Sequence, residues 1–371
     1  MAGIFKAYDV RGKIDTLDDE TVYKIGAGFA RMLQEEEGRK DVRIIVGYDM
    51  RETSPRMAQA ISDGVIDMGA DVVDIGLVTT PMSYFAAANI EAQGGVMVTA
   101  SHNPKEYNGM KFTRTGGISL TYEGGIEYIE HFVKNTDLTQ LEEMKVQQVG
   151  KIEERDIKKA YMQFMIQHTN IEEPLKVVVD AGNGMAGLDV PVLAENVPHL
   201  SLVPMYFDLD GTFPNHEANP LRYETLKDLQ NRVVEEKADF GAAFDGDADR
   251  VVFIDEKGQM ISADLITALV AKERLEEMSR DSAEKPKILY DLRSSRIIRE
   301  IVEEYGGQPI MCRVGHSYIQ ELMIQHDAIF AGELSGHYYF KEFYNCDNGM
   351  FMFIQLLNLC SATEKTLSEL M

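Results

Sequence analysis

Three short polar segments of the sequence combine residue types that do chemistry, and each of them follows an apolar run. They are TASHNPKEYNGMK (99–111), DGDADR (245–250) and GELSGH (332–337). The second segment places Asp245, Asp247 and Asp249 at alternate positions. Carboxylates this close repel one another unless a cation neutralises them, and hard oxygen ligands suit Mg²⁺ or Mn²⁺. This segment predicts a divalent-metal site, with a solvated acidic turn as the alternative.

The acidic segment also begins like an EF-hand loop, because D-x-D-x-D opens that motif and Glu256 falls at its twelfth position. The sixth position, however, is Arg250 rather than glycine, and the strand-like VVFI follows it. These departures disfavour the EF-hand interpretation. Arg250 beside the acids instead favours a phosphate site, because a guanidinium and a metal ion can hold phosphate oxygens together.

The first segment offers Ser101, His102 and Lys111 within one short predicted loop. Ser101 is a candidate phosphoryl carrier, and an N-cap or turn serine is the ordinary alternative. A lysine in a dry, basic cleft can have its pKa lowered enough for proton transfer, so Lys111 is a candidate acid–base group. Otherwise it is a solvated residue after an Asn-Gly turn. His102 could share this role or hold the phosphate.

The third segment alternates Glu333, Ser335 and His337. If it is extended, all three side chains point to one side. A carboxylate and a hydroxyl so aligned can hydrogen-bond a diol, and the flanking glycines let the backbone approach a ligand closely. The pattern predicts sugar binding, with a satisfied β-turn as the alternative.

The elements that must position these segments recur three times along the chain. Apolar strands that end in Asp are predicted at 43–49, 176–180 and 287–291. Each is followed by a turn-rich loop, a helix, a second strand, a second helix and a third strand. This alternation predicts right-handed βαβ units and mainly parallel sheets. The polar segments follow the third strands, at the edge where open α/β sheets bind ligands.

The length of 371 residues is too great for one ordinary domain. We therefore expect an α/β protein of three successive βαβαβ-type domains, with mainly parallel mixed sheets arranged around a central cleft. The expected boundaries are 1–150, 151–257 and 258–371. If the domains share a cleft, the polar segments meet there; three independent domains with polar loops are the alternative. The chain stops at Met371 inside a helical pattern, which suggests a missing segment.

Composition excludes several function classes. Lys and Arg number 37 against 61 Asp and Glu, a formal net charge of −24, so the chain should repel nucleic acid and anionic membranes. The N-terminus has no apolar signal sequence, and the apolar stretch 350–359 is too short to span a bilayer, so we expect a core helix there. Three cysteines without a C-x-x-C pair suggest buried hydrophobes and a reducing compartment. A cytoplasmic protein is expected.

Taken together, the segments resemble the α-D-phosphohexomutase superfamily, specifically its phosphomannomutase/phosphoglucomutase branch. TASHNPKEYNGMK resembles the phosphoserine loop, DGDADR the metal loop and GELSGH the sugar-recognition loop, in the family's order, and YDVRG (8–12) fits a further signature. The resemblance covers essentially the whole chain. It implies a phosphohexomutase that acts on sugar phosphates, interconverting hexose 1-phosphate and hexose 6-phosphate of mannose or glucose. Hexose 1,6-bisphosphate would be the intermediate and activator.

The resemblance also implies catalytic and metal-binding roles for individual residues. One Mg²⁺ per chain would be bound by Ser101 as phosphoserine together with Asp245, Asp247 and Asp249. Lys111 would be the general acid/base, with His102 beside it. Arg11 and Arg250 would supply positive charge around the transferred phosphoryl group.

Substrate-binding roles follow in the same way. Glu333 and Ser335 would hold the ring hydroxyls of the sugar, and His337 would line the pocket. His316, in VGHS, matches a second active-site histidine. Arg293, in YDLRSS, stands where some relatives have lysine.

The family normally continues into a fourth domain with a phosphate-binding loop of the R-x-S-x-T-E-P kind, and this sequence has no such loop. We therefore expect a shortened form with reduced turnover, because remote binding energy helps to position the reacting end. A catalytically silent sugar-phosphate-binding protein is one alternative. Phosphoglucosamine mutase is another, although Leu334 favours the mannose/glucose branch, since the glucosamine branch often has glutamine there.

Overall fold

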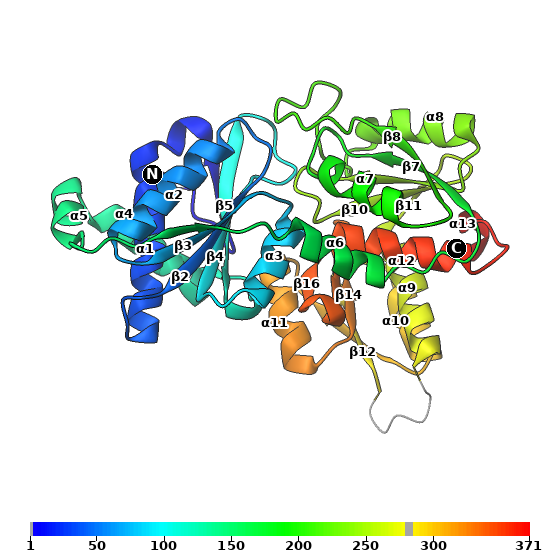
Figure 1. Cartoon of the computed structure of the whole chain (residues 1–371). Helices are drawn as coiled ribbons and strands as arrows, with labels where there is room; N and C mark the ends of the chain where they lie inside the picture. The colour runs from blue at the N-terminus through cyan, green and yellow to red at the C-terminus, as the bar shows by residue number, and fades with distance from the viewer. Residues whose placement is uncertain (1–2, 279–284) are drawn as a thin grey trace. The chain divides into compact units, whose positions relative to one another are not determined.

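The computed structural model in Figure 1 describes residues 3–278 and 285–371. The chain divides into two compact units, Met1–Lys159 and Ala160–Met371. The described strands form three sheets, one in the first unit and two in the second. Each sheet mixes parallel and antiparallel pairs and is accompanied by helices. The predicted fold class, α/β with three successive mixed-sheet domains, is confirmed.

The first unit is built on a six-stranded sheet of order β1-β5-β4-β2-β3-β6. Its strands are β1 (Val10–Lys13), β2 (Arg43–Tyr48), β3 (Asp71–Leu77), β4 (Gly94–Val98), β5 (Tyr107–Arg114) and β6 (Ile152–Glu154). The pairs of β2 with β3 and β4, and of β3 with β6, are parallel. β5 runs antiparallel to both β4 and β1.

Helices of the first unit pack closely on each other and on this sheet. They are α1 (Asp19–Glu37), α2 (Ser54–Asp67), α3 (Thr80–Asn89), α4 (Glu127–Asn135) and α5 (Leu138–Met144). α1 begins at the N-cap Asp18, whose side chain accepts from the N–H of Thr21. A Cβ at Gly64 of α2 would lie 2.2 Å from the carbonyl oxygen of Tyr23, so glycine permits the close contact of α1 and α2.

The second unit contains a five-stranded sheet of order β11-β10-β9-β7-β8. Its strands are β7 (Leu175–Asp180), β8 (Leu200–Met205), β9 (Phe240–Phe244), β10 (Val251–Asp255) and β11 (Met260–Ile261). β7 is parallel to β8 and β9, and β10 is antiparallel to β9 and β11. The accompanying helices are α6 (Lys158–Gln167), α7 (Ala186–Asn196) and α8 (Lys227–Glu236).

The same unit holds a further five-stranded sheet of order β13-β12-β14-β15-β16. Its strands are β12 (Lys287–Asp291), β13 (Gln308–Cys312), β14 (Phe330–Gly332), β15 (Tyr338–Phe340) and β16 (Cys346–Asp347). The helices are α9 (Ala263–Glu277), α10 (Ile297–Glu304), α11 (His316–His326), α12 (Gly349–Ser361) and α13 (Leu367–Leu370). β12 is parallel to β13 and β14, whereas β15 is antiparallel to β14 and β16.

The apolar stretch near the C-terminus forms a buried helix, as predicted. α12 runs beside α6 (Figure 1), and the ring centroids of Phe164 and Phe351 lie 6.2 Å apart. No described helix combines the length and apolar composition needed to cross a membrane. Cys312, Cys346 and Cys360 are free and buried, as expected for small hydrophobes.

One strand order recurs in all three sheets. The first strand of each predicted repeat (β2, β7 or β12) lies between the second and third strands and is parallel to both, and we call it the central strand of its repeat. A fourth, antiparallel strand (β5, β10 or β15) pairs with the third. The three polar segments therefore occupy the same place, at the connection between a third and a fourth strand.

Two local expectations were wrong. Lys111 does not lie in the loop with Ser101, because β5 begins at Tyr107, and the Asn108-Gly109 pair lies inside that strand rather than in a turn. Glycine is needed there for packing: a Cβ at Gly109 would lie 2.2 Å from the carbonyl oxygen of Val10 on β1. GELSGH is likewise not extended, because it forms a tight turn between β14 and β15.

Candidate active site

Ser101 lies in the turn after β4, in the first unit, with only 1% of its surface exposed. Its φ of +50° is in the left-handed region, which non-glycine residues rarely adopt. The N–H of Ser101 donates to Thr99 Oγ1 at 2.9 Å, and its Oγ lies 3.2 Å from Nδ1 of His102. The predicted phosphoryl carrier and its neighbouring histidine are thus in contact.

Two other basic residues of the first unit adjoin this loop. Arg11, on β1, donates to Asn103 Oδ1 and to Asp9 Oδ2, each at 2.7 Å. Arg51, which the sequence analysis did not single out, donates to the carbonyl oxygen of Ser101 at 2.7 Å. Lys111 lies on β5, where it is 5% exposed and pairs with a residue of β4. The first unit therefore brings Arg11 and Arg51 to the Ser101 loop and places Lys111 on the adjoining strand.

The metal-loop carboxylates, Asp245, Asp247 and Asp249, lie in the turn between β9 and β10 of the second unit. All three residues are 0% exposed, and one ligand atom from each lies within 4.8 Å of the others. The turn is closed by Ala248, with φ of +64°, and by the N–H of Arg250, which donates to Asp245 Oδ1 at 3.2 Å. Three buried carboxylates this close fit a divalent cation with oxygen ligands.

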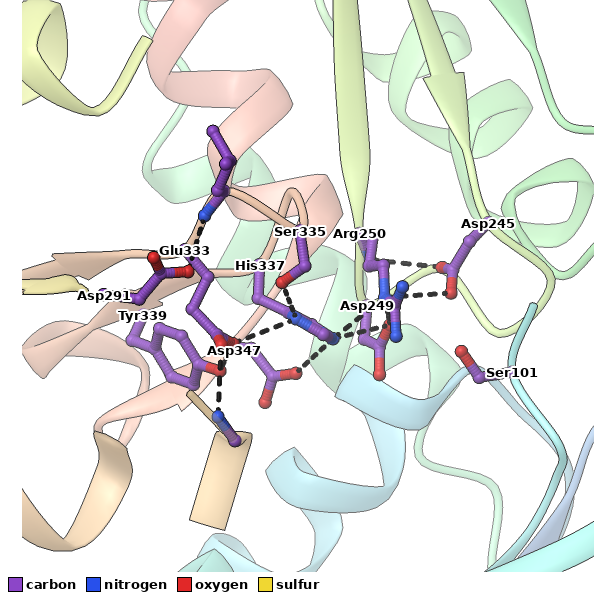
Figure 2. Close-up of polar contacts among 12 residues, drawn as sticks. Ser101, Asp245, Asp249, Arg250, Asp291, Glu333, Ser335, His337, Tyr339 and Asp347 are labelled. Carbon is purple, nitrogen blue, oxygen red and sulfur yellow. Dashed lines mark hydrogen bonds and ion pairs between the residues drawn. The ribbon is translucent and has the colours of Figure 1, made fainter. Parts of the chain in front are cut away.

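Arg250 lies against the same carboxylates (Figure 2). Its Nε is 3.7 Å from Asp245 Oδ2 and 3.9 Å from Asp249 Oδ1. Burial works against the charged form, but the adjacent carboxylates, Asp245 foremost, raise the pKa of Arg250. The side chain is therefore a fixed positive charge beside the acidic cluster.

The loop after β7 packs against the backbone of the metal loop. The carbonyl oxygen of Gly246 accepts from the N–H of Met185 at 2.9 Å. A Cβ at Gly184 would lie 2.9 Å from that carbonyl oxygen, so only glycine fits there. At the end of β7, Asp180 Oδ2 lies 2.9 Å from Nε2 of His216. This pair was not predicted, because His216 comes from a long loop far along the chain.

The sugar-recognition segment forms a turn that brings its three polar side chains together. The N–H of Glu333 donates to the carbonyl oxygen of His337 at 2.9 Å, and Gly336 takes a φ of +81°. Figure 2 shows Nδ1 of His337 between Ser335 Oγ, at 2.9 Å, and Glu333 Oε2, at 3.1 Å. The residues are therefore adjacent through a turn rather than through strand alternation.

Glu333 is held as a carboxylate by its neighbours. Burial alone would raise its pKa, but the hydrogen bond from His337 and other contacts lower it to about 2. Its Oε2 accepts from the hydroxyl of Tyr339 at 2.6 Å, and its Oε1 from the N–H of Gly315 at 3.1 Å. Burial and Arg250 lower the pKa of His337, but the surrounding carboxylates raise it to about 9. The two residues form a buried ion pair.

The metal loop and the sugar loop adjoin each other within the second unit. Arg250 and His337 form an antiparallel bridge, and the N–H of Val251 donates to the carbonyl oxygen of Gly336 at 3.1 Å. Nε2 of His337 lies 3.6 Å from Asp249 Oδ1 and 3.7 Å from Asp347 Oδ2. Asp347, on β16, was not predicted, since only the β15–β16 pairing brings it to this histidine.

The remaining predicted residues lie beside Glu333. Arg293 donates to Asp291 Oδ2 at 2.6 Å, lies 3.7 Å from Glu333 Oε1, and leaves 44% of its side chain exposed. His316 is the first residue of α11 and is 7% exposed. It directly follows Gly315, whose N–H binds Glu333.

Comparison with known proteins agrees with this arrangement. Family models described as phosphoglucomutase/phosphomannomutase, alpha/beta/alpha domains I, II and III match residues 2–140, 159–258 and 262–371. A phosphomannomutase of Escherichia coli (strain K12) is 36% identical over 99% of this chain and 79% of its own length. A phosphomannomutase/phosphoglucomutase of Pseudomonas aeruginosa is 38% identical, over 98% of this chain and 75% of its own.

A solved structure gives the same result in three dimensions. A phosphoglucomutase/phosphomannomutase family protein of Burkholderia thailandensis superposes with a TM-score of 0.90 at 33% identity. The match covers 99% of this chain and 78% of that one. This chain therefore belongs to the phosphoglucomutase/phosphomannomutase family of phosphohexomutases.

Proposed function

We propose that this isomerase interconverts hexose 1-phosphate and hexose 6-phosphate, of mannose or glucose, through phosphoserine at Ser101 and a hexose 1,6-bisphosphate intermediate that also serves as activator. The observation that carries the proposal is the cluster of three fully buried carboxylates beside Arg250. In the same unit this cluster adjoins the loop of Glu333 and His337. Ser101 occupies the equivalent connection of the first sheet, and we propose that all three loops serve one cleft.

The donor set suits Mg²⁺. The ion would be held by Asp245, Asp247 and Asp249 and by the phosphoryl group on Ser101. When bound, the cation supplies positive charge to the phosphoryl oxygens. Arg250 adds a fixed guanidinium beside the same carboxylates and can hold phosphoryl oxygens through paired N–H donors.

The chain's own residues account for the group transfer. The bond between phosphorus and Ser101 Oγ breaks as a bond to O6 of the hexose 1-phosphate forms, which gives the 1,6-bisphosphate. Lys111 takes the proton from the O6 hydroxyl and returns it to Ser101 Oγ, with His102 in contact with that oxygen. The reverse transfer from O1 to Ser101 releases hexose 6-phosphate. In-line placement and fixed charge supply most of the catalysis in such transfers.

Sugar recognition falls to the turn between β14 and β15. Glu333, ionised at neutral pH, accepts hydrogen bonds from ring hydroxyls, and Ser335 adds a hydroxyl. We propose that His337, His316 and Arg293 line the sugar-binding pocket, where their positive charge favours an anionic ligand, and that Arg11 also serves substrate binding. Leu334 in this turn supports mannose or glucose rather than glucosamine as the sugar.

The organisation of the chain is part of the proposal. We divide it into a phosphoserine-loop domain (1–150), a metal-loop domain (151–257) and a sugar-recognition domain (258–371). The three buried, free cysteines support a reducing compartment, and we place the protein in the cytoplasm.

A coupled assay tests this function. Turnover is measured with the 1-phosphates of mannose, glucose and glucosamine, for the wild-type chain and for Ser101→Ala. We expect turnover of the mannose and glucose substrates and none in the variant. Preference for glucosamine 1-phosphate would make the protein a phosphoglucosamine mutase. Binding of hexose 1,6-bisphosphate without any turnover would make it a silent sugar-phosphate-binding protein.

A further inference from the structure

The buried side chain of Arg51 wraps the loop that carries Ser101. The residue is 2% exposed and lies three positions after the end of the central strand β2. Its two terminal nitrogens donate four hydrogen bonds of 2.6–3.0 Å to backbone carbonyl oxygens of Ser101, Asn103, Pro104 and Tyr107. Backbone atoms from one end of the loop to the other are thus bound to one guanidinium.

Asp49 fixes this guanidinium from the other side. It follows β2 directly, is 0% exposed, and its Oδ2 lies 3.3 Å from Nε of Arg51. Its Oδ1 accepts from the N–H of Arg51 at 3.0 Å and from Ser54 Oγ at 2.5 Å. The hydroxyl of Ser54 in turn accepts from Asn108 Nδ2 at 2.9 Å. The carboxylate therefore connects β2, the start of α2 and β5.

These contacts decide what Arg51 does. A guanidinium has five N–H groups; four donate to loop carbonyls and the fifth faces Asp49. All five are directed at the protein's own groups, so Arg51 differs from an arginine that binds substrate phosphate. Ser101 meanwhile sits at a φ of +50°. This conformation costs energy for a serine and persists only where the surroundings over-determine it.

We propose that Arg51, locked by Asp49, is a positioning residue that imposes the left-handed conformation of Ser101 and thereby sets the rate of phosphoryl transfer at its hydroxyl. The inference rests on the proposed role of Ser101 as phosphoryl carrier. Arg51 acts on the loop, so its loss should lower kcat and the transfer rate and leave KM for the hexose phosphate nearly unchanged.

The third sheet has a related Asp-x-Arg pair, in which the aspartate rather than the arginine contacts the loop. Asp291 is the last residue of the central strand β12 and precedes Arg293 by two positions, as Asp49 precedes Arg51. Oδ1 of Asp291 accepts from the N–H of Arg293 at 2.7 Å, and Oδ2 accepts from the N–H of Leu334 in the sugar loop at 2.9 Å. In both sheets, one member of an Asp-x-Arg pair at the end of the central strand binds the loop that follows the third strand: Arg51 in the first sheet and Asp291 in the third.

The test follows the transfer of one phosphoryl group from glucose 1,6-bisphosphate to Ser101. In this step a phosphorus–sugar oxygen bond breaks, a bond to Ser101 Oγ forms, and the serine proton passes to the sugar oxygen. Rapid quenching and intact-mass measurement give the rate for the wild-type chain, Arg51→Met and Arg51→Lys. We expect a loss of about 10²-fold in Arg51→Met, the penalty typical of a small misplacement of a reacting group, and partial recovery in Arg51→Lys.

Gln34 offers a matched control. Its buried side chain also donates to two backbone carbonyls of the first unit, Lys40 O and Met68 O, both at 2.8 Å, but it lies on α1 rather than at the loop. Gln34→Met should keep the transfer rate within about twofold of wild type, because no reacting group is displaced. Equal losses in both variants would show general destabilisation and overturn the proposal, as would a folded Arg51→Met with the wild-type rate.

A second pair keeps the test decisive if Arg51→Met does not fold. Thr99 Oγ1 accepts the N–H of Ser101; Thr99→Val removes this acceptor at nearly constant volume, and Thr99→Ser retains it. Slow transfer in the valine variant with rescue by serine supports imposed geometry at Ser101, whereas wild-type rates in both overturn it.

If the wild-type chain takes up no phosphoryl group, or Ser101→Ala takes up as much, the proposed function fails before Arg51 is in question.

Discussion

Two Asp-x-Arg sequences, one in each unit, end the central strands of their sheets and reach different outcomes. Arg51 is buried, and its N–H groups donate hydrogen bonds to backbone carbonyl oxygens of the Ser101 loop. Arg293 leaves 44% of its side chain exposed, and the carboxylate of Asp291, rather than the arginine, binds the neighbouring loop through the N–H of Leu334. The same local pattern thus gives a buried arginine that binds its own loop in one sheet, and a half-exposed arginine in the other.

The difference lies in what the loop presents to the arginine. The Ser101 loop turns four carbonyl oxygens inward, which only a buried donor can satisfy. The turn after β14 is shorter and presents one N–H to Asp291, so Arg293 remains half-exposed beside Glu333. Sequence position alone therefore does not separate a positioning arginine from one that can meet substrate.

The metal loop extends this comparison and carries the largest expected effect. The Ser101 loop is bound by the positive charge of Arg51. The three carboxylates of Asp245, Asp247 and Asp249, by contrast, carry more negative charge than Arg250 alone neutralises. Chelation of divalent ions should therefore lower turnover by at least about 10²–10³-fold, the scale for losing a preorganised charge. Re-adding Mg²⁺ should restore turnover and raise Tm in the wild type but not in Asp247→Asn. Full turnover after exhaustive chelation would contradict the metal assignment.

Exchanging the arginines for methionine separates their roles. Arg51→Met leaves Asp49 buried without its partner, and burial already raises the pKa of that carboxyl while Arg51 opposes it. We expect a loss of about 3–5 kcal/mol in the free energy of unfolding, together with reduced kcat. Arg293→Met should cost less than about 1 kcal/mol, because the arginine is half-exposed, and should raise KM.

Urea unfolding and steady-state kinetics on the same preparations check this pair. Loss of stability in Arg293→Met as large as in Arg51→Met would remove the distinction between the two sites.

Acid unfolding sharpens the comparison at Glu333, because its pKa is lowered, whereas burial raises the pKa of Asp49 beside Arg51. The pKa of Glu333 is lowered from 4.5 to about 2 in the folded chain. Because the pKa is lowered on folding, ionised Glu333 stabilises the folded chain fully above about pH 4.5, and this stabilisation is lost as the pH falls toward 2. The free energy of unfolding of wild type minus that of Glu333→Gln should therefore shrink as the pH falls from about 4.5 toward 2. A difference independent of pH would contradict the ion pair.

The smallest effect concerns the side chain of Leu334. Asp291 holds this residue by its backbone N–H, so Leu334→Gln should leave the turn in place and change the free energy of unfolding by no more than about 0.5 kcal/mol. We expect the ratio of glucosamine 1-phosphate to mannose 1-phosphate turnover to rise. An unchanged ratio would show that sugar preference does not depend on this position.

Local sequence patterns predicted most of the fold. The apolar runs ending at Asp49, Asp180 and Asp291 became the central strands β2, β7 and β12, because continuous apolar runs bury both faces of a strand. The acidic alternation of DGDADR likewise indicated the carboxylate cluster. β5 was missed, because Asn108 and Gly109 are typical of turns, whereas here Gly109 lets β1 approach.

Contacts between distant residues could not be predicted. Arg51 meets the carbonyl oxygen of Ser101 across 50 positions, and nothing in MRETSP indicates that partner. Asp347 reaches His337 only through the pairing of β15 with β16. Such partners are fixed by strand order, which local patterns of hydrophobicity do not specify.

The most direct test of the central claim is a single turnover of the phosphorylated chain. Protein carrying one phosphoryl group on Ser101, mixed with Mg²⁺ and glucose 1-phosphate, should lose that group as an equal amount of glucose 1,6-bisphosphate forms. Replacing Asp247 by Asn should abolish the transfer and leave the group on the protein. A phosphoryl group that stays on Ser101 in the wild-type chain, or that passes to water instead of the sugar, would contradict the account.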